Sequence, residues 1–516
     1  MNPLLQQYLI GISLVYLMTR PFLGGVLNAY NPMFDYYRTA PTGSMPLLAG
    51  AICMLCGAGL YAFLSRLVLL RPRGQERVEY FQAVALAAFL PTLAIYSRPL
   101  GFNIFMVAQV ALMVWALNKR GARLRGLTTK AMMLFSALVL VLLATAVWQA
   151  QGGAEAGVVH SSPREADKTS SAAGGRRLVW VIFDELDYRI AVDRRPAGIE
   201  LPELDRLLAQ AVVGRQTKAA GAWTRDIIPA LLTGEPIESV REKSAGELRI
   251  TPASTGQEVD FSSKVNLFQK ARAGGIRTAV TGWYHPYCRL IGDDTDSCAW
   301  QPAPDARDSV RAQWAAELDG PQATFMALLQ APLRTAFAQA ERKQILHELN
   351  LVRRQHLDAF RAIHENALRQ AADPSYQLVF LHYNIPHPFG IFDRKTREYS
   401  LSDSTDYVDN LVLMDRVIGE IRGSLDANTS LLVMSDHSFR PYVWDYRPTW
   451  SKEMAELTAG GQDFRTVFAL HMAGQEAPVS YETPFNAIVA HTLALEIALG
   501  RMRSAEDATA WIDAHR

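Results

Sequence analysis

Three short apolar segments of this 516-residue chain end in, or lead into, acidic and imidazole side chains. The segments are "LVWVIFDELD" (178–187), "YQLVFLHYN" (376–384) and "SLLVMSDH" (430–437), and their length and β-branched content predict buried strands. The polar residues at their ends are Asp184, Glu185, His382, His387, Asp436 and His437. Because ligands of parallel sheets bind beyond the carboxyl ends of the strands, we expect these side chains to share one edge.

A divalent metal ion is the partner that this combination of side chains favours. Two or more carboxylates with one or two imidazoles fit such an ion, and histidine favours zinc or manganese over calcium. We expect zinc ahead of manganese. A simpler alternative exists for each pair, because Asp-His or Asp-Glu after a strand can also form a turn or cap a helix. The agreement of separate strand ends on one predicted edge favours the metal site.

A candidate nucleophile lies in "GAWTRDIIPALLTGEP" (221–236), where Thr224 precedes a helix predicted to begin near Arg225 or Asp226. A threonine hydroxyl at a helix N-terminus gains from the backbone N–H groups and from the positive end of the dipole. A bound metal would lower the hydroxyl pKa further and make it a nucleophile at neutral pH. The alternative, which the local sequence alone favours, is that Thr224 is only an N-cap.

The part of the chain after residue 177 predicts the scaffold that would position these groups. Strand-like and helix-like segments alternate, which is typical of an α/β domain with a mostly parallel sheet sandwiched by helices. The predicted strands span 177–185, 275–284, 376–384 and 430–437, and the predicted helices span 201–212, 264–274, 321–372 and 404–425.

The first 149 residues predict a membrane anchor of about five helices, because several apolar runs approach the roughly 20 residues that cross a bilayer. The first run begins at residue 4, and the other four cover 45–70, 80–96, 101–117 and 131–148. If 80–117 is re-entrant, the anchor has four spans instead. Residues 150–177 are rich in Gly, Ala and Ser and predict a flexible linker, so that residues 178–516 form the catalytic domain.

Loop charges predict the orientation of this anchor. The segments 71–79 and 118–130 are rich in arginine and lysine, so both belong on the cytoplasmic side. With five spans, the loop that contains Arg38 and the whole of 178–516 then lie outside the cytoplasm. A disulfide between Cys288 and Cys298 suits such an oxidising compartment; two unpaired thiols are the alternative. The formal net charge of +1 gives no indication of nucleic-acid binding.

Four motifs occur in the order found in a known family: "VIFDEL", "TRDIIPALLTG", "IPHPFGIFD" and "VMSDH". From 178 to about 475 the chain resembles the alkaline phosphatase superfamily, and within it the membrane-anchored, sulfatase-like branch of phosphoethanolamine and phosphoglycerol transferases. The resemblance implies that Thr224 is both the nucleophile and a metal ligand, and that His387 contacts the transferred phosphate group. The other implied metal ligands are Glu185, Asp184 as a possible second acid, Asp436 and His437.

The chain departs from that family in two places. It has no C/S-x-P-x-R motif, which disfavours cleavage of sulfate esters. The segment "RTVFALHMAGQ" (465–475) carries Thr466 where many relatives have a histidine, so we expect one bound metal rather than two. Arg465 could pair with a phosphate there instead, although it could equally be an exposed strand-start residue. His382 is a further candidate for substrate binding and proton transfer, or else a packed residue at the strand end.

The expected function is that of a bacterial enzyme of the inner membrane, multi-pass, with a periplasmic catalytic domain. It would transfer or hydrolyse a phosphate-linked group through a phospho-threonine intermediate, taking a membrane lipid as donor and an envelope glycan or lipid as acceptor. One alternative is a phosphodiesterase or phosphatase of the same fold. The other is a catalytically degenerate member that binds a glycan or a partner protein.

Overall fold

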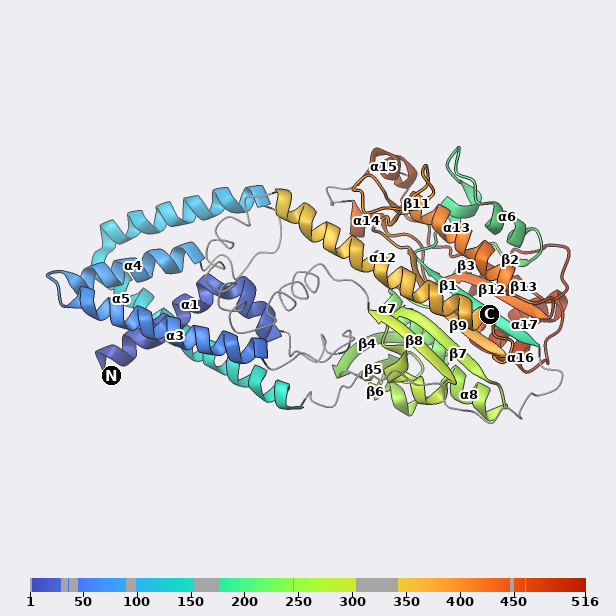
Figure 1. Ribbon diagram of the computed structural model, residues 1–516, viewed down its shortest axis with the longest axis horizontal. Helices are drawn as coiled ribbons and strands as arrows, with labels where there is room; N and C mark the ends of the chain where they lie inside the picture. Colours follow the sequence, from blue (N-terminus) through green and yellow to red (C-terminus); the bar gives the residue numbers. More distant parts are fainter. Residues whose placement is uncertain are drawn as a thin grey trace. The chain divides into compact units, whose positions relative to one another are not determined.

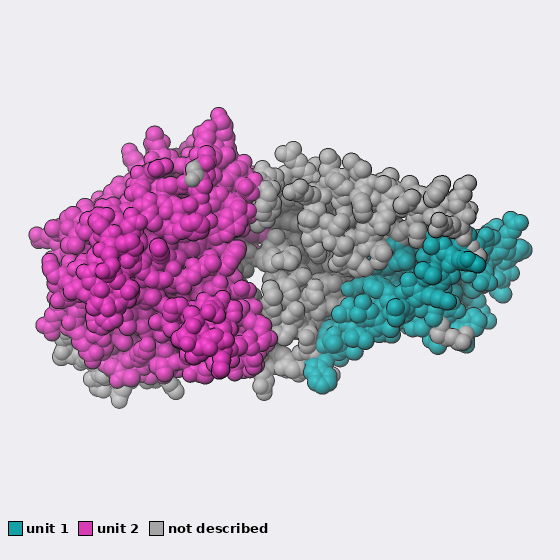
Figure 2. Space-filling model, turned by 180° about the vertical axis from the view of Figure 1, so that it is seen from behind, with its two compact units in different colours: residues 1–35, 40–157, 306–349 teal, residues 36–39, 158–305, 350–516 magenta. Residues whose placement is uncertain are grey.

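The computed structural model forms two compact units, shown in different colours in Figure 2. The first comprises residues 1–35, 40–157 and 306–349, and the second residues 36–39, 158–305 and 350–516. The structure describes residues 2–28, 36, 45–89, 99–152, 176–244, 246–302, 342–445, 450–459 and 461–516. The predicted linker lies largely outside these described residues.

The described part of the first unit is helical. Its helices are α1 (Pro3–Asn28), α3 (Met45–Leu69), α4 (Gly74–Phe89) and α5 (Pro99–Gly152). Helices α1 and α3 approach closely because Gly11 faces Ala58, where an added Cβ would lie 2.8 Å from the Ala58 carbonyl oxygen. Close approach through small residues is typical of helices in membranes.

Two helical segments of this unit, Gly50–Leu69 and Arg123–Trp148, are long and apolar enough to cross a membrane, while the apolar segment Pro3–Met18 is shorter. The predicted basic loop at 118–130 is shorter than expected, because the two helical parts of α5 meet within it at a kink. Only Gly121 departs from helical backbone angles there, with φ 49° and ψ −129°, a conformation that glycine adopts at little cost. Residues 90–98, in the second half of the predicted 80–96 span and beyond it, lie outside the described residues.

The second unit is built on an eight-stranded sheet with the strand order β14-β2-β13-β12-β1-β9-β7-β8 (Figure 1). All its described neighbours pair in parallel except β13, which runs antiparallel to β12 and β2, so the predicted mostly parallel α/β sheet is confirmed. In sheet order the bounds are Val479–Tyr481, Val212–Gly214, Phe468–His471, Thr429–Ser435, Arg177–Asp184, Leu378–Pro386, Thr278–Tyr284 and Ser297–Pro302.

Helices cover both faces of this sheet. α7 (Thr224–Thr233), α8 (Leu267–Ala273) and α16 (Ala490–Ala498) pack on one face, and α13 (Tyr407–Ser424) packs against β9 on the other (Figure 1). The remaining helices are α6 (Pro202–Leu208), α9 (Tyr287–Leu290), α12 (Arg342–Ala372), α14 (Pro441–Trp444), α15 (Lys452–Thr458) and α17 (Ala505–His515).

Three smaller sheets complete the described strands. They are β4-β5-β6 (Ile237–Ser244, Glu247–Pro252 and Val259–Asp260), β10-β11 (Phe392–Asp393 and Glu398–Tyr399) and β15-β3 (Phe485–Asn486 and Thr217–Lys218).

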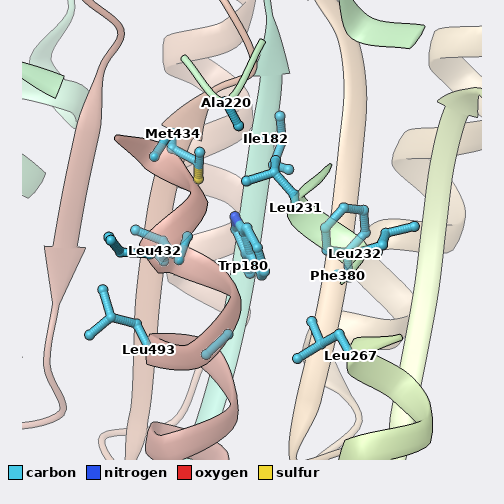
Figure 3. Close-up of a cluster of buried hydrophobic side chains, with 14 of the residues drawn as sticks. Trp180, Ile182, Ala220, Leu231, Leu232, Leu267, Phe380, Leu432, Met434 and Leu493 are labelled. Carbon is cyan, nitrogen blue, oxygen red and sulfur yellow. The ribbon is translucent and has the colours of Figure 1, made fainter. Parts of the chain in front are cut away.

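The central strands are buried along their whole length, as expected for a sheet covered on both faces. Trp180 of β1 meets the ring of Phe380 of β9 edge-on at 5.2 Å. Leu432 of β12 and Leu493 of α16 belong to the same core (Figure 3). This packing holds β1, β9 and β12 in register, with Ile182 opposite both His382 and Met434.

The predicted disulfide between Cys288 and Cys298 is confirmed. It ties α9 to β8 and closes a loop directly after β7. The predicted helix at 404–425 is also present, and it begins where Asp406 and Asp409 form a capping box. Residues 321–341 of the long predicted helix lie outside the described part of the chain, and α12 begins at Arg342.

Candidate functional site

The carboxyl ends of β1, β9 and β12 bring three metal-competent side chains together. Asp184 is the last residue of β1, His382 lies in β9, and Asp436 directly follows β12. One donor atom from each of the three lies within 4.8 Å of the others, and all three residues are buried. The parallel register of the strands creates this arrangement from segments more than 50 residues apart.

The unsatisfied atoms of this cluster fit a bound metal. Asp184 Oδ1 and His382 Nε2 are buried without a hydrogen-bond partner, although buried polar atoms almost always have one. The nearby charges are three carboxylates (Asp184, Glu185 and Asp436) against one guanidinium (Arg440), which leaves a formal charge of −2 when all are ionised. A divalent cation with carboxylate and imidazole ligands, such as zinc or manganese, would neutralise that charge.

Thr224 lies beside the cluster as the first residue of α7. Its hydroxyl donates a hydrogen bond to Asp436 Oδ2 at 2.8 Å and lies 3.1 Å from His437 Nε2. The N-cap of α7 is Trp223, which makes no side-chain capping bond. Thr224 is therefore not the N-cap of α7, because its hydroxyl bonds to the cluster and not to the helix backbone.

His437 is oriented so that Nε2 is free to accept. Its Nδ1 lies 3.0 Å from the carbonyl oxygen of Ser438. Because a carbonyl only accepts, Nδ1 carries the ring proton, and Nε2 of the neutral ring is an acceptor or a metal ligand. Burial lowers the His437 pKa, which favours this neutral form. Nε2 also lies 3.5 Å from Asp184 Oδ1. We call Asp184, Thr224, His382, Asp436 and His437 the Thr224 cluster.

Glu185 does not point into the Thr224 cluster, in contrast to the ligand role that the resemblance implied. Its Oε1 accepts two hydrogen bonds from Arg440, at 3.1 and 3.0 Å, and the indole of Trp444 donates to its Oε2 at 3.1 Å. The residue has a left-handed backbone with φ 62°. Its backbone N–H donates to Asp436 Oδ1 at 3.1 Å. Burial raises the Glu185 pKa to about 7, and Arg440 opposes that shift.

His382 belongs among the metal-competent residues, whereas the sequence indicated a substrate contact. Its Nδ1 lies 2.8 Å from the hydroxyl of Tyr287, which leaves Nε2 toward the cluster. Burial lowers the His382 pKa to about 4, so the ring is neutral. A neutral imidazole with one nitrogen held by a hydroxyl is the form in which histidine binds metals.

His387 lies outside the metal-competent group but is joined to it through the backbone. Its N–H donates to the carbonyl oxygen of Asp184 at 3.0 Å. Its ring stacks on His356 with centroids 5.8 Å apart and meets Trp283 and Trp444 edge-on at 5.1 and 4.9 Å. Burial and the neighbouring imidazole hold the His387 pKa well below its usual value. Its Nδ1 is buried without a partner and is available to a ligand.

Arg465 forms ion pairs with two acids and not with the residues of the Thr224 cluster. It forms ion pairs with Asp193 and Asp463, both at 2.6 Å, and its guanidinium lies 4.6 Å from the ring centre of Tyr188. We call these three charged residues the Arg465 cluster. Thr466 pairs through its backbone with Asp187.

The structure places two further residues at the site: Arg440, which the sequence indicated as an anion contact or an exposed loop arginine, and Trp444, which the sequence did not indicate. Arg440 is buried, holds Glu185 and lies 4.3 Å over the ring of Trp223, next to Thr224. Trp444 holds the same carboxylate. The only sequence signal for Arg440 was its position three residues after His437, which exposed loop arginines share.

No family model matches the chain, and no curated protein matches it significantly. Solved structures do match, among them a protein in the alkaline phosphatase superfamily from Vibrio parahaemolyticus, with 13% identity, 63% of this chain and 66% of that chain covered, and a TM-score of 0.35.

Two further structures are similar over comparable lengths. The lipoteichoic acid synthase LtaP from Listeria monocytogenes is 13% identical, with 66% of this chain and 75% of that chain covered and a TM-score of 0.36. The phosphonate monoester hydrolase of Agrobacterium radiobacter is 14% identical, with 63% and 74% covered and a TM-score of 0.36. Of these three, the Vibrio parahaemolyticus protein is described as a member of the alkaline phosphatase superfamily, the family that the four motifs resemble. The function proposed below rests on the geometry of the site.

Proposed function

We propose that this chain is a membrane-anchored, metal-dependent enzyme that transfers or hydrolyses a phosphate-linked group, with Thr224 as the nucleophile. The observation that carries the proposal is the position of the Thr224 hydroxyl, 2.8 Å from Asp436 and 3.1 Å from His437 Nε2. A hydroxyl in this position has two acceptors for its proton and the positive end of a helix dipole beside its oxygen. Both effects favour the alkoxide over the neutral alcohol.

The Thr224 cluster supplies the donors that a zinc or manganese ion would need. Asp184, His382 and Asp436 would hold it, with His437 and Thr224 in reach from the neighbouring loop and helix. When bound, the ion would lower the pKa of the hydroxyl and neutralise charge on the phosphate oxygens. Glu185, held by Arg440, is better suited to fix the Asp436 carboxylate through its backbone N–H than to bind the ion.

The proposed reaction has two displacements at phosphorus. Thr224 Oγ gives its proton to Asp436 or His437 and forms the Oγ–P bond, while the bond from phosphorus to the donor alcohol breaks and that alcohol leaves with a proton. An acceptor hydroxyl or water then attacks the phospho-threonine, the Oγ–P bond breaks, and Thr224 regains a proton. The guanidinium of Arg440, over Trp223, adds positive charge beside the transferred group.

Features in the rest of the chain support the proposed location and substrates. Two described helices are long and apolar enough to span a membrane, and the disulfide suits an oxidising compartment. We therefore place the enzyme in the bacterial inner membrane with a periplasmic catalytic domain. A domain tethered at that surface can take a phosphoethanolamine or phosphoglycerol headgroup from a lipid and pass it to an envelope glycan or lipid.

Mass spectrometry of the Thr224 peptide tests this proposal. The full chain in detergent is incubated with phosphatidylethanolamine or phosphatidylglycerol vesicles, and one headgroup phosphate should be found on Thr224. Thr224→Ala should abolish the modification, and Thr233→Ala should retain it, because the Thr233 hydroxyl bonds to the Pro229 carbonyl at the far end of α7. A modification that survives Thr224→Ala would refute the role of Thr224. An unmodified wild type that also leaves bis(p-nitrophenyl) phosphate intact would refute the reaction.

The pair between Glu185 and Arg440 favours a second candidate, a degenerate member that binds an envelope glycan or a protein without catalysis. A carboxylate expected to bind metal is neutralised there by an arginine. Metal analysis separates the two candidates, because an enzyme of the proposed kind retains close to one zinc or manganese per chain. A chain without stoichiometric metal after purification in the presence of both ions would support the binding protein.

A further inference from the structure

A residue far from the motifs lies inside the core of the catalytic unit. Tyr36 comes between α1 and α3 in the sequence, but residues 36–39 group with the second unit. Its side chain is fully buried, in a core that includes Ile227, Phe261 and Tyr287. A tyrosine at such a depth needs a partner for its hydroxyl.

That partner is His285, which in turn reaches the backbone of the proposed nucleophile. The hydroxyl of Tyr36 lies 2.7 Å from His285 Nδ1, and His285 Nε2 lies 3.4 Å from the carbonyl oxygen of Thr224. The two rings meet edge-on with centroids 5.9 Å apart. Tyr36, His285 and Thr224 therefore form a continuous chain of polar contacts from a buried tyrosine to the first turn of α7.

The direction of the hydrogen bonds along this chain follows from the chemistry of its ends. A carbonyl oxygen only accepts, so His285 Nε2 carries the proton and donates to Thr224. Burial lowers the His285 pKa to about 3, so the ring is neutral and has one proton only. Nδ1 must then accept, and Tyr36 is its donor. Loss of the Tyr36 hydroxyl would leave Nδ1 buried without a partner and remove what fixes this tautomer.

The same loop also contacts the metal-competent group. Tyr287, two residues after His285, places its hydroxyl 2.8 Å from His382 Nδ1. The neighbouring Cys288 is tied to Cys298 by the disulfide. One loop therefore supports both the helix turn that carries Thr224 and the imidazole of His382, and Tyr36 is the contact that comes from the N-terminal part of the chain.

We propose that Tyr36 is a positioning residue that acts through His285 to hold the first turn of α7, and with it the Thr224 hydroxyl, in the orientation of the Thr224 cluster. The kinetic part of this inference rests on the proposed function. The placement agrees with the topology expected from the loop charges, in which the loop containing Arg38 lies on the same side of the membrane as residues 178–516. The catalytic site is thus completed by a residue that precedes most of the membrane anchor in the sequence.

The first test is hydrogen–deuterium exchange of the full chain in detergent, which requires no substrate. The amides of Asp226 and Ile227 bond to the Trp223 carbonyl in the first turn of α7, at 2.8 and 2.9 Å. Tyr36→Phe should raise their exchange about tenfold and leave β1 and β12 unchanged. Tyr442→Phe, on a side chain that is 58% exposed, is the matched control and should change neither. Unaltered exchange in the first turn would overturn the inference.

The second test is a double-mutant cycle with bis(p-nitrophenyl) phosphate as the probe. Tyr36→Phe should lower kcat about tenfold, keep KM within about twofold and retain the metal content of the wild type. In a His285→Ala background, Tyr36→Phe should have no further effect, because both changes break the same chain of contacts. Effects that multiply fully would show that Tyr36 acts independently of His285 and would overturn the inference. If the wild type cleaves no phosphodiester, the proposed function fails, and the exchange experiment alone decides the role of Tyr36.

Discussion

Two groups of charged side chains in the second unit differ in how their charges are balanced. In the Arg465 cluster, Arg465 lies between Asp193 and Asp463 and is neutralised by them, with side chains that are partly exposed. In the Thr224 cluster the acids are buried and face imidazoles and a hydroxyl, and Asp184 Oδ1 has no partner. The acids of the Arg465 cluster are paired within the protein, whereas the donor atoms of the Thr224 cluster fit a cation.

This difference separates a structural role from a chemical one. Exposed ion pairs contribute little to stability and leave no donor or acceptor for a ligand. A buried group with unpaired atoms costs stability, and such a cost is typical of functional sites. The comparison therefore predicts large effects on activity from one cluster and small effects from the other.

The largest expected effect is the loss of activity when a cluster carboxylate is removed. Asp436→Asn should lower kcat/KM for bis(p-nitrophenyl) phosphate by about 10³-fold, since metal and nucleophile both depend on this side chain. The matched change in the other group, Arg465→Ala, should lower it less than about threefold. Equal losses in the two variants would abolish the distinction between the clusters.

The next effect is on stability. A cation present at a hundred times its Kd stabilises the folded chain by about 2.7 kcal/mol, so chelation should lower the Tm of the catalytic unit by roughly 5 °C. Asp184→Asn should remove this response to the chelator, and Arg465→Ala should retain it. A chelator response that survives Asp184→Asn would place the stabilising metal elsewhere.

The smallest expected effect concerns Asp187, a buried acid that pairs through its backbone with Thr466. Burial raises its pKa to about 6 from an ordinary 3.8, so the folded state favours the neutral carboxyl. Its contribution to stability is present below about pH 4 and is lost as the pH rises through 6. In chelated protein, Asp187→Asn should remove a fall in unfolding free energy on the order of 2 kcal/mol between those pH values. An identical pH profile for wild type and variant would contradict the assignment.

Sequence reasoning predicted which strand ends meet at the candidate site because strand ends are encoded locally. Apolar β-branched runs predicted β1, β9 and β12, and the rule for parallel sheets predicted that Asp184 and Asp436 meet. The alternation of strands and helices was enough to predict the fold, and the spacing of Cys288 and Cys298 was enough to predict the disulfide.

The features of the site that sequence reasoning did not predict depend on backbone angles and on contacts between distant residues. The left-handed backbone of Glu185 turns its side chain to Arg440, which nothing in "DEL" indicates. Which of two adjacent acids faces the cluster is therefore decided by tertiary structure. The position of Tyr36 was not predicted for a similar reason, since its contact with His285 joins segments about 250 residues apart. The connection at 118–130 is shorter than predicted because a single glycine, Gly121, accommodates the kink between the two helical parts of α5.

The most direct test of the proposed metal site is anomalous scattering from crystals of the full chain grown with zinc. We expect one peak at about 2.0–2.2 Å from donor atoms of Asp184, Asp436 and at least one of His382 and His437, with the Thr224 oxygen next to it. A catalytically active chain whose metal lies away from these residues, or that binds none, would contradict it.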